Sequence, residues 1–246
     1  MLTFISRVFF HTPVGDAHCG LRGFRKDAYE RMKLRATGME FASEMVIKAS
    51  LKGMRIAEVP VALRPDGRSR PPHLRTWRDG WRHLRFMLLF SPRWLFLYPG
   101  LGLFAVGVLL SALLLPGPLL LAGVRLDVHT LLVAGFLALI GYQLVLFAVF
   151  TKIFAVRTGF HPPHPMLEAM FRYVTLEVGL IAGALMVLTG LVALVLAVAS
   201  WGSVGFGNLD TSVTMREVIP AVVLLALGTQ TVFASFFISI LSIDRD

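Results

Sequence analysis

The sequence predicts an α-helical membrane protein in which a basic polar segment and an interfacial helix precede four transmembrane helices. The first observation is composition: 56% of the 246 residues are hydrophobic and 16% are charged, against about 45–50% and about 25% in soluble domains. The second is charge distribution. Residues 1–94 hold 18 Lys and Arg against 8 Asp and Glu, whereas residues 95–246 hold 6 against 7. This hydrophobicity excludes disordered and low-complexity classes.

Four apolar runs have the length of membrane-spanning helices. A helix needs about 20 apolar residues to cross roughly 30 Å of hydrocarbon. The runs are Leu95–Leu115, His129–Phe150, Val174–Ser200 and Val218–Ile243. They predict a transmembrane domain over residues 95–246.

Basic residues in the connections predict the orientation. The connection after the second run carries Lys152, Arg157 and Arg172, whereas the first holds only Arg125 and the third only Arg216. Positive charges favour the cytoplasmic side. We therefore expect a multi-pass protein of the inner membrane with both termini in the cytoplasm. The N-terminus lacks the pattern of a cleavable signal peptide.

Polar residues within the runs are few. Gln143 and Gln230 lie in the middle of their runs, and an intramembrane amide can mark a transport pathway. A hydrogen bond between helices is the simpler interpretation. A transporter or flippase remains a third hypothesis, weakened by the absence of charges at mid-span. Gly179 and Gly183 are spaced for close helix packing.

Short elements are predicted in the basic segment. One helix is expected over Lys26–Lys33, and a second begins after Gly38 and stops at Gly53, with apolar residues four apart along it. The alternation of Arg55–Leu63 predicts a strand, and Pro60 would restrict it to an edge. So few elements cannot bury a large core, so the segment is interpreted as the end of something larger.

A basic amphipathic helix is predicted over residues 75–90, within an interfacial region of residues 73–94. Apolar residues are expected on one face and arginines beside them: Trp77, Trp81, Leu84 and Leu88, then Arg78, Arg82 and Arg85. Tryptophans and arginines suit an anionic lipid surface. The charge alone would also suit nucleic acid, but the helix leads directly into a membrane run. We expect membrane lipids as partners and no nucleic acid.

Four ordered motifs carry a resemblance to a known family. They are Asp16–Asp27 (DAHCGLRGFRKD), Gly38–Glu44 (GMEFASE), Ile56–Val61 (IAEVPV) and Gly67–Arg70 (GRSR). This order resembles the C-terminal part of family-2 glycosyltransferases of the polyprenyl-phosphate group, which are similar to dolichol-phosphate mannosyltransferase. The resemblance continues through the interfacial helix and the four spans, including Gly141–Gln143 and Gly228–Gln230.

The resemblance implies a fold and an activity. Residues 1–72 would be the C-terminal part of a mixed α/β catalytic domain of the glycosyltransferase A type. The enzymes of this group move a hexose from a nucleotide-sugar to a polyprenyl phosphate at the cytoplasmic face. The nucleotide-sugar and the polyprenyl phosphate are therefore the expected partners of a complete enzyme.

Candidate site residues follow from the same resemblance. Asp16 is expected to be catalytic, as a base or by orienting the acceptor phosphate, although a capping role is an alternative. Glu40 is expected to position the substrate. Arginines supply always-charged donors for phosphate oxygens, and four are candidates for phosphate binding: Arg22, Arg64, Arg68 and Arg70. Coating of the anionic leaflet is the alternative for these arginines.

The chain departs from the family in its first half. The family's nucleotide-binding sheet and its Asp-x-Asp metal motif are not found. The sequence Asp244–Asp246 has the Asp-x-Asp spacing but is interpreted as a polar tail. We expect no metal site and no cofactor in this chain alone, with Mg²⁺ or Mn²⁺ in a complete enzyme. A split gene, a mis-assigned start or an inactive remnant would each explain the missing nucleotide-binding half. The expected protein partner is a separate catalytic half or a second copy of the chain in a homo-oligomer. The alternative function is a non-enzymatic anchor or scaffold for another catalytic chain.

Two smaller signals are interpreted as structural. His161 and His164 are separated by prolines, which prevent the helix that would align them on a metal, so a cytoplasmic turn is expected. Cys19 is the single cysteine, which excludes an intrachain disulfide, and it is expected to be buried.

Overall fold

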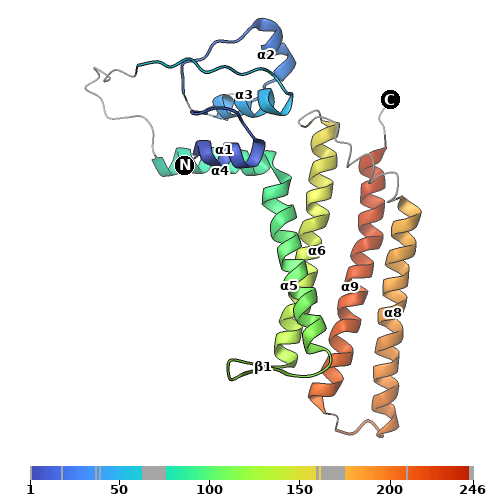
Figure 1. Cartoon of the computed structure of the whole chain (residues 1–246). Coiled ribbons are helices and arrows are strands. Elements are labelled where there is room, and N and C mark those ends of the chain that lie inside the picture. The colour runs from blue at the N-terminus through green and yellow to red at the C-terminus, as the bar shows by residue number, and fades with distance from the viewer. Residues whose placement is uncertain are drawn as a thin grey trace. The chain divides into compact units, whose positions relative to one another are not determined.

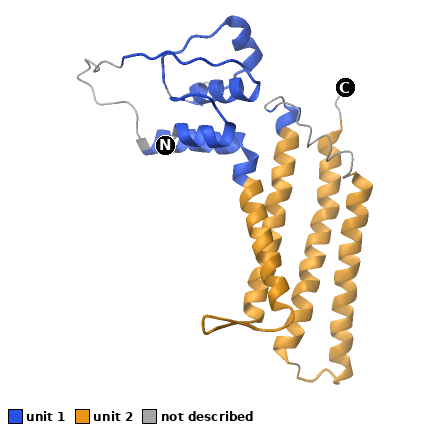
Figure 2. Cartoon of the chain, in the orientation of Figure 1, with its two compact units in different colours: residues 1–95, 155–162 blue, residues 96–154, 163–246 orange. Residues whose placement is uncertain are grey.

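The described residues form two compact units. The computed structural model describes residues 2–17, 19–36, 38, 40–62, 76–158, 161, 175–208 and 210–243. Unit 1 consists of residues 1–95 and 155–162, and unit 2 of residues 96–154 and 163–246 (Figure 2).

Four complete helices lie in the described part of unit 1 (Figure 1). They are α1 (Leu2–Phe10), α2 (Lys26–Met32), α3 (Glu40–Leu51) and α4 (Thr76–Phe90). The predicted helices in this part of the chain are confirmed. Gly53, with φ +61°, ends α3 as expected, and the N–H of Met54 donates to the carbonyl of Ala49 behind it, as in a Schellman C-cap.

Two small apolar clusters hold unit 1 together. Phe10 of α1, Ile47 of α3 and Met87 of α4 are almost fully buried against one another. On the other side of α3, Met45 and Ala49 pack against Met32 of α2. The four-residue spacing of apolar positions in α3 therefore produces a buried face, because residues i and i+4 lie on one side of a helix.

The predicted strand over Arg55–Leu63 is wrong for its described part. Residues 54–62 have no regular secondary structure, and Val59 and Val61 are 78% and 58% exposed. A strand requires a neighbour to accept its ladder hydrogen bonds, and in the described part of unit 1 none lies beside this segment. Leu63 lies outside the described residues.

The predicted faces of α4 need correction. His83 and Met87 point into unit 1 and are at least nine-tenths buried. The exposed side carries Trp77, Trp81, Arg85 and Leu89, which are four apart and thus form one stripe. We call these four residues the α4 stripe. Leu84 and Leu88, expected beside the tryptophans, are half-buried, because the apolar arc of α4 also faces α1 and α3.

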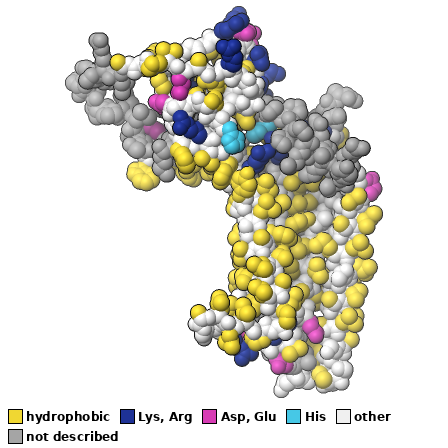
Figure 3. All heavy atoms as spheres, in the orientation of Figure 1, with side chains coloured by type: hydrophobic (Ala, Val, Ile, Leu, Met, Phe, Trp, Pro, Cys, Tyr) yellow, Lys and Arg dark blue, Asp and Glu magenta, His cyan; other side chains and the backbone are white. Residues whose placement is uncertain are grey.

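Unit 2 contains the four candidate membrane helices, confirming the sequence prediction. A π-helical turn (η1, Arg93–Leu97) leads into α5, and the long helices are α5 (Tyr98–Leu114), α6 (Val128–Arg157), α8 (Leu176–Ser203) and α9 (Thr211–Ser242). Helices α6, α8 and α9 are each long and apolar enough to span a bilayer, as are η1 and α5 taken together (Arg93–Leu114). Side chains on the visible surface of unit 2 are mainly hydrophobic (Figure 3), as lipid-facing helices require.

Glycines permit close contact between neighbouring helices of unit 2. A Cβ atom on Gly107 of α5 would overlap the backbone of Ala138 in α6. On α8, a Cβ atom on Gly183 would lie 2.8 Å from the carbonyl oxygen of Gly228 in α9. The small-residue spacing around Gly183 therefore marks a close helix contact, as predicted.

A polar link between α6 and α9 differs from the predicted one. The hydroxyl groups of Tyr142 and Thr231 lie 2.6 Å apart. The neighbouring Gln230 was expected to make an interhelical hydrogen bond, but its buried Oε1 atom has no partner among the described residues. Gln143 and Gln230 instead line an apolar cavity of about 520 Å³ between the two helices.

A small hairpin joins α5 to α6. Strands β1 (Leu119–Leu121) and β2 (Val124–Leu126) are antiparallel, with Leu120 opposite Arg125. After the hairpin, the carboxylate of Asp127 pairs with both Arg125 and Arg216 of α9. Arg125 and Arg216 thus share the Asp127 carboxylate as their ion-pair partner.

Candidate functional site

Asp16 lies on an exposed loop that a distant glutamate braces. The Glu58 carboxylate accepts hydrogen bonds from the backbone N–H of Gly15, at 2.8 Å, and of Asp16, at 3.2 Å. The side chain of Asp16 is exposed. The loop is thus held through its backbone while the Asp16 side chain stays accessible.

The Arg22 side chain hydrogen-bonds to the backbone of this loop on the C-terminal side of Asp16. Its Nε and Nη2 atoms donate to the carbonyls of Cys19 and Ala17, at 2.8 and 2.6 Å. Its Nη1 atom donates to Ala42 in the first turn of α3 at 2.5 Å. Burial lowers the pKa of the Arg22 guanidinium, against the opposing influence of Cys19 and Asp16. These bonds give Arg22 a structural role, and its predicted phosphate binding remains a prediction.

Cys19 belongs to the same loop. The prediction of a buried cysteine is only partly right, because the side chain is half-buried. Its Sγ atom lies 3.8 Å from the carbonyl oxygen of Leu21.

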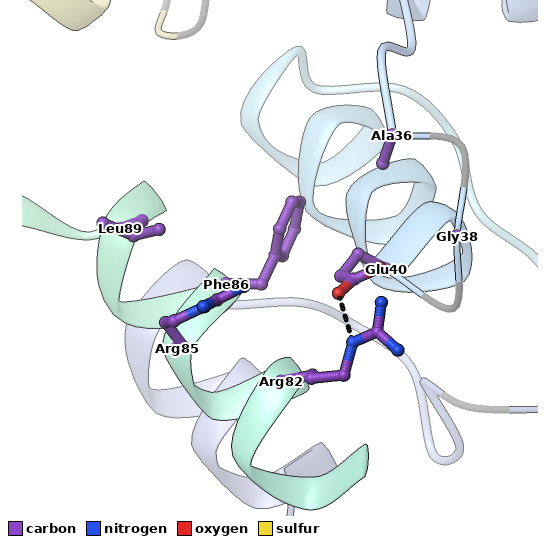
Figure 4. Close-up of a pocket in the computed structure, with 7 residues that line it drawn as sticks. All are labelled: Ala36, Gly38, Glu40, Arg82, Arg85, Phe86 and Leu89. Carbon is purple, nitrogen blue, oxygen red and sulfur yellow. Dashed lines mark hydrogen bonds and ion pairs between the residues drawn. The ribbon is translucent and has the colours of Figure 1, made fainter. Parts of the chain in front are cut away.

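Glu40 begins α3, whose first turn Arg22 contacts, and it lines a cavity between α3 and α4. Its carboxylate pairs with Nε of Arg82 at 3.1 Å. A hydrogen bond from its own backbone N–H lowers the pKa of Glu40, and Arg82 lowers it further. The cavity, of about 320 Å³, is shown in Figure 4. Its lining residues are Ala36, Gly38, Glu40, Arg82, Arg85, Phe86 and Leu89.

Gly38 leaves space at this cavity. A Cβ atom there would lie 2.8 Å from Oε2 of Glu40 and 3.7 Å from Nη2 of Arg82. A larger residue would therefore displace the carboxylate that holds Arg82.

A buried ion pair fixes the connection between α2 and α3. Nζ of Lys48 lies 2.7 Å from Oε1 of Glu44, and the two side chains are 3% and 1% exposed. Glu44 also accepts hydrogen bonds from the backbone N–H of Arg35 and Ala36, and Lys48 donates to the carbonyl of Lys33 at 2.6 Å. Burial raises the pKa of Glu44, but Lys48 and the two backbone donors outweigh it, so the pKa is lowered overall.

Ser43 and His83 form a second buried contact between α3 and α4. The Ser43 hydroxyl lies 2.9 Å from Nδ1 of His83. Burial lowers the pKa of His83. Both side chains are at least nine-tenths buried, so the pair joins the helices and is not open to a substrate.

The structure therefore groups the predicted residues only in part. Asp16 and Arg22 share one loop, and Arg22 also bonds to the first turn of α3, where Glu40 lines the cavity beside α4. Arg64, Arg68 and Arg70 lie outside the described residues. Among the described residues, no group of three His, Cys, Asp or Glu side chains is placed to hold a metal ion.

Sequence reasoning missed three residues that shape the Asp16 loop and the cavity, and one further contact within unit 1. Glu58 occurs within the third motif, but its partner is 43 residues away. Arg82 and Arg85 were interpreted only as contacts for a lipid surface. His161 also makes a contact, because its Nε2 atom lies 2.9 Å from the carbonyl oxygen of Phe90.

Comparison with known proteins gives two matches of different extent. Residues 149–242 match the glycosyltransferase family 2 C-terminal transmembrane region. Over 97% of its length the chain is also 38% identical to the low-salt glycan biosynthesis hexosyltransferase Agl6 of Haloferax volcanii. The chain spans 56% of the length of that relative. No solved structure matches.

Proposed function

We propose that this chain is the membrane-embedded, C-terminal portion of a polyprenyl-phosphate glycosyltransferase. The reaction is transfer of a hexose from a nucleotide-sugar to a polyprenyl phosphate at the cytoplasmic face of the membrane. The observation that carries the proposal is the 38% identity to a hexosyltransferase, which extends over 97% of the chain and so includes both units.

In this proposal, unit 1 supplies the acceptor side of the reaction. An oxygen of the lipid phosphate forms a bond to the anomeric carbon of the sugar, and the bond from that carbon to the nucleoside diphosphate breaks. Asp16 takes the remaining proton from the acceptor phosphate or orients it. The exposed Asp16 side chain, on a loop braced by Glu58 and Arg22, supports this role.

A second candidate function is a non-enzymatic anchor for a separate catalytic chain. The observation that favours it is the use of Arg22, which directs three donors to backbone carbonyls of its own chain. An anchor needs a folded unit 1 and a membrane domain but no reacting side chain.

A transfer assay separates the two functions. The chain is purified in detergent and supplied with polyprenyl phosphate, Mg²⁺ or Mn²⁺, and a panel of labelled nucleotide-sugars. The longest open reading frame that contains the chain is tested in parallel. Labelled lipid from either preparation supports the enzyme, and its absence from both contradicts the proposal.

Variants then test the site. Asp16→Asn should reduce formation of labelled lipid by at least about a hundredfold, the lower range for loss of an acid–base group. Asp27→Asn is the matched control, because Asp27 is an exposed aspartate of the same motif that pairs with Arg25. Equal activity of the two variants would remove Asp16 from the site.

A further inference from the structure

The cavity between α3 and α4 shares residues with the exposed stripe of α4. Arg85 and Leu89 belong to the α4 stripe and also line the cavity. The other stripe residues, Trp77 and Trp81, are 92% and 59% exposed. Exposed tryptophans on a basic helix suit the boundary between headgroups and acyl chains. A cavity that opens beside such a stripe is accessible to a molecule lying in a bilayer surface.

The charges of the cavity favour an anion. Arg82 and Arg85 are its two cations and Glu40 its single anion. Glu40 already pairs with Arg82, which holds this guanidinium at the cavity wall. Arg85 contributes a second, exposed guanidinium one helical turn further along α4. An arginine fork matches the oxygens of a phosphate group in shape as well as charge.

The remaining wall is apolar. Phe86 and Leu89 come from the same helix as the two arginines (Figure 4), and Leu89 is 62% exposed. A ligand with a phosphate at one end and a hydrocarbon chain at the other matches this arrangement. The cavity volume, about 320 Å³, lies at the small end of ligand pockets, which suits a headgroup with its chain outside.

We propose that this cavity binds the phosphate of a lipid phosphate monoester. Arg85, together with the Glu40-paired Arg82, holds the phosphate, and the hydrocarbon chain leaves along Phe86 and Leu89. The inference rests on the proposed function, because it locates the acceptor of that reaction. It adds a binding site that uses the interfacial helix itself.

Binding, measured without any sugar donor, tests this site. The full chain in detergent is titrated with radiolabelled farnesyl phosphate, and farnesol and inorganic phosphate serve as competitors. Farnesyl phosphate should bind, farnesol should compete at least about tenfold less well, and inorganic phosphate should compete weakly. Arg85→Gln should weaken binding about tenfold, as expected for loss of a charge-assisted hydrogen bond.

Arg78→Gln is the matched control. Arg78 is an arginine of α4 with 62% exposure, so the variant removes the same charge from the same helix outside the cavity lining. Equal weakening by both variants would show general attraction to the helix and overturn the site. Farnesol that binds as well as farnesyl phosphate would also overturn it, and inorganic phosphate that competes equally would overturn a lipid ligand.

The assay also distinguishes this inference from the proposed function. Specific binding without sugar transfer would leave the cavity assignment standing and contradict the transferase. Transfer that persists unchanged in Arg85→Gln would leave the transferase standing and contradict the cavity assignment.

Discussion

The carboxylate of Glu58 lies 2.8 Å from the backbone nitrogen of Gly15, which is 43 residues earlier in the chain. Both carboxylate oxygens accept from this N–H, and one of them also accepts from Asp16. The loop that presents Asp16 is therefore shaped by a side chain from a segment with no regular secondary structure. A carboxylate can replace strand pairing here because it satisfies backbone donors directly.

Removing this brace should loosen the loop. We expect Glu58→Ala to increase hydrogen exchange at the amides of Gly15 and Asp16 about tenfold or more, since their acceptor is lost. Exchange in α3 should stay unchanged. Glu30→Ala, an exposed glutamate of α2, is the control, and equal exchange in both variants would show that Glu58 does not hold the loop.

The buried pair of Glu44 and Lys48 should dominate the stability of unit 1. Removing one member of a buried pair typically costs about 3–5 kcal/mol, so we expect Lys48→Met to cost about 3 kcal/mol. Arg25→Met removes a cation whose side chain is 86% exposed and should have little effect. The stability change in each variant is measured as the change in hydrogen-exchange protection of the α2 and α3 amides. A small effect of Lys48→Met would contradict the prediction.

The same pair predicts a pH dependence. The pKa of Glu44 is below its ordinary value of 4.5 in the folded chain, so the unfolded chain binds this proton more readily. The stabilisation is therefore present in full above about pH 4.5 and lost as the pH falls below it. Exchange protection of the α2–α3 connection between pH 6 and pH 3 measures it. Protection that rose on acidification would contradict the assigned direction.

A side chain at Gly107 should disrupt the contact between α5 and α6. A Cβ atom there would overlap the backbone of Ala138, and overpacking of this kind costs about 1–3 kcal/mol. Gly107→Ala should therefore lower the thermal stability of the chain in detergent. Gly102→Ala in the same helix has open space around it and should be neutral or slightly stabilising. Equal melting temperatures for the two variants would refute this packing.

The predicted orientation can be tested with a reporter fused after Asp246. The basic residues of 1–94 and of the connection after α6 predict a cytoplasmic C-terminus. A reporter active only in the cytoplasm should therefore give a signal, and one active only outside it should give none. The opposite pattern would overturn the orientation. A second fusion within the hairpin between α5 and α6 should behave inversely.

Local patterns predicted most of the helices. The four-residue spacing of apolar positions identified the face of α3 that carries Met45 and Ala49, because i and i+4 contacts are encoded within a few residues. It did not identify the opposite face, where Ile47 is buried. The four long apolar runs identified the membrane helices for the same reason. Their ends shifted, and α9 begins at Thr211, seven residues before the predicted start, because polar side chains can occupy the end of a long helix.

Contacts between distant residues were not predictable in this way. Arg82 finds Glu40 across 42 residues, and a single sequence contains no signal for such a pairing. Arg22 was identified as functional, but its partners are backbone carbonyls, which every residue carries. The expected strand failed for a related reason: alternation shows that a segment suits a sheet, not that a neighbouring strand is present.

The backbone of the loop that carries Asp16 is held by side chains of the same chain. Its braces, the Glu58 carboxylate and the Arg22 guanidinium, come from within residues 15–58 of the same chain, and neither requires a sheet or a bound ligand. Both braces bond to main-chain atoms of the loop, so the exposed side chain at position 16 can be exchanged during evolution without loss of the hydrogen bonds that set the loop's backbone.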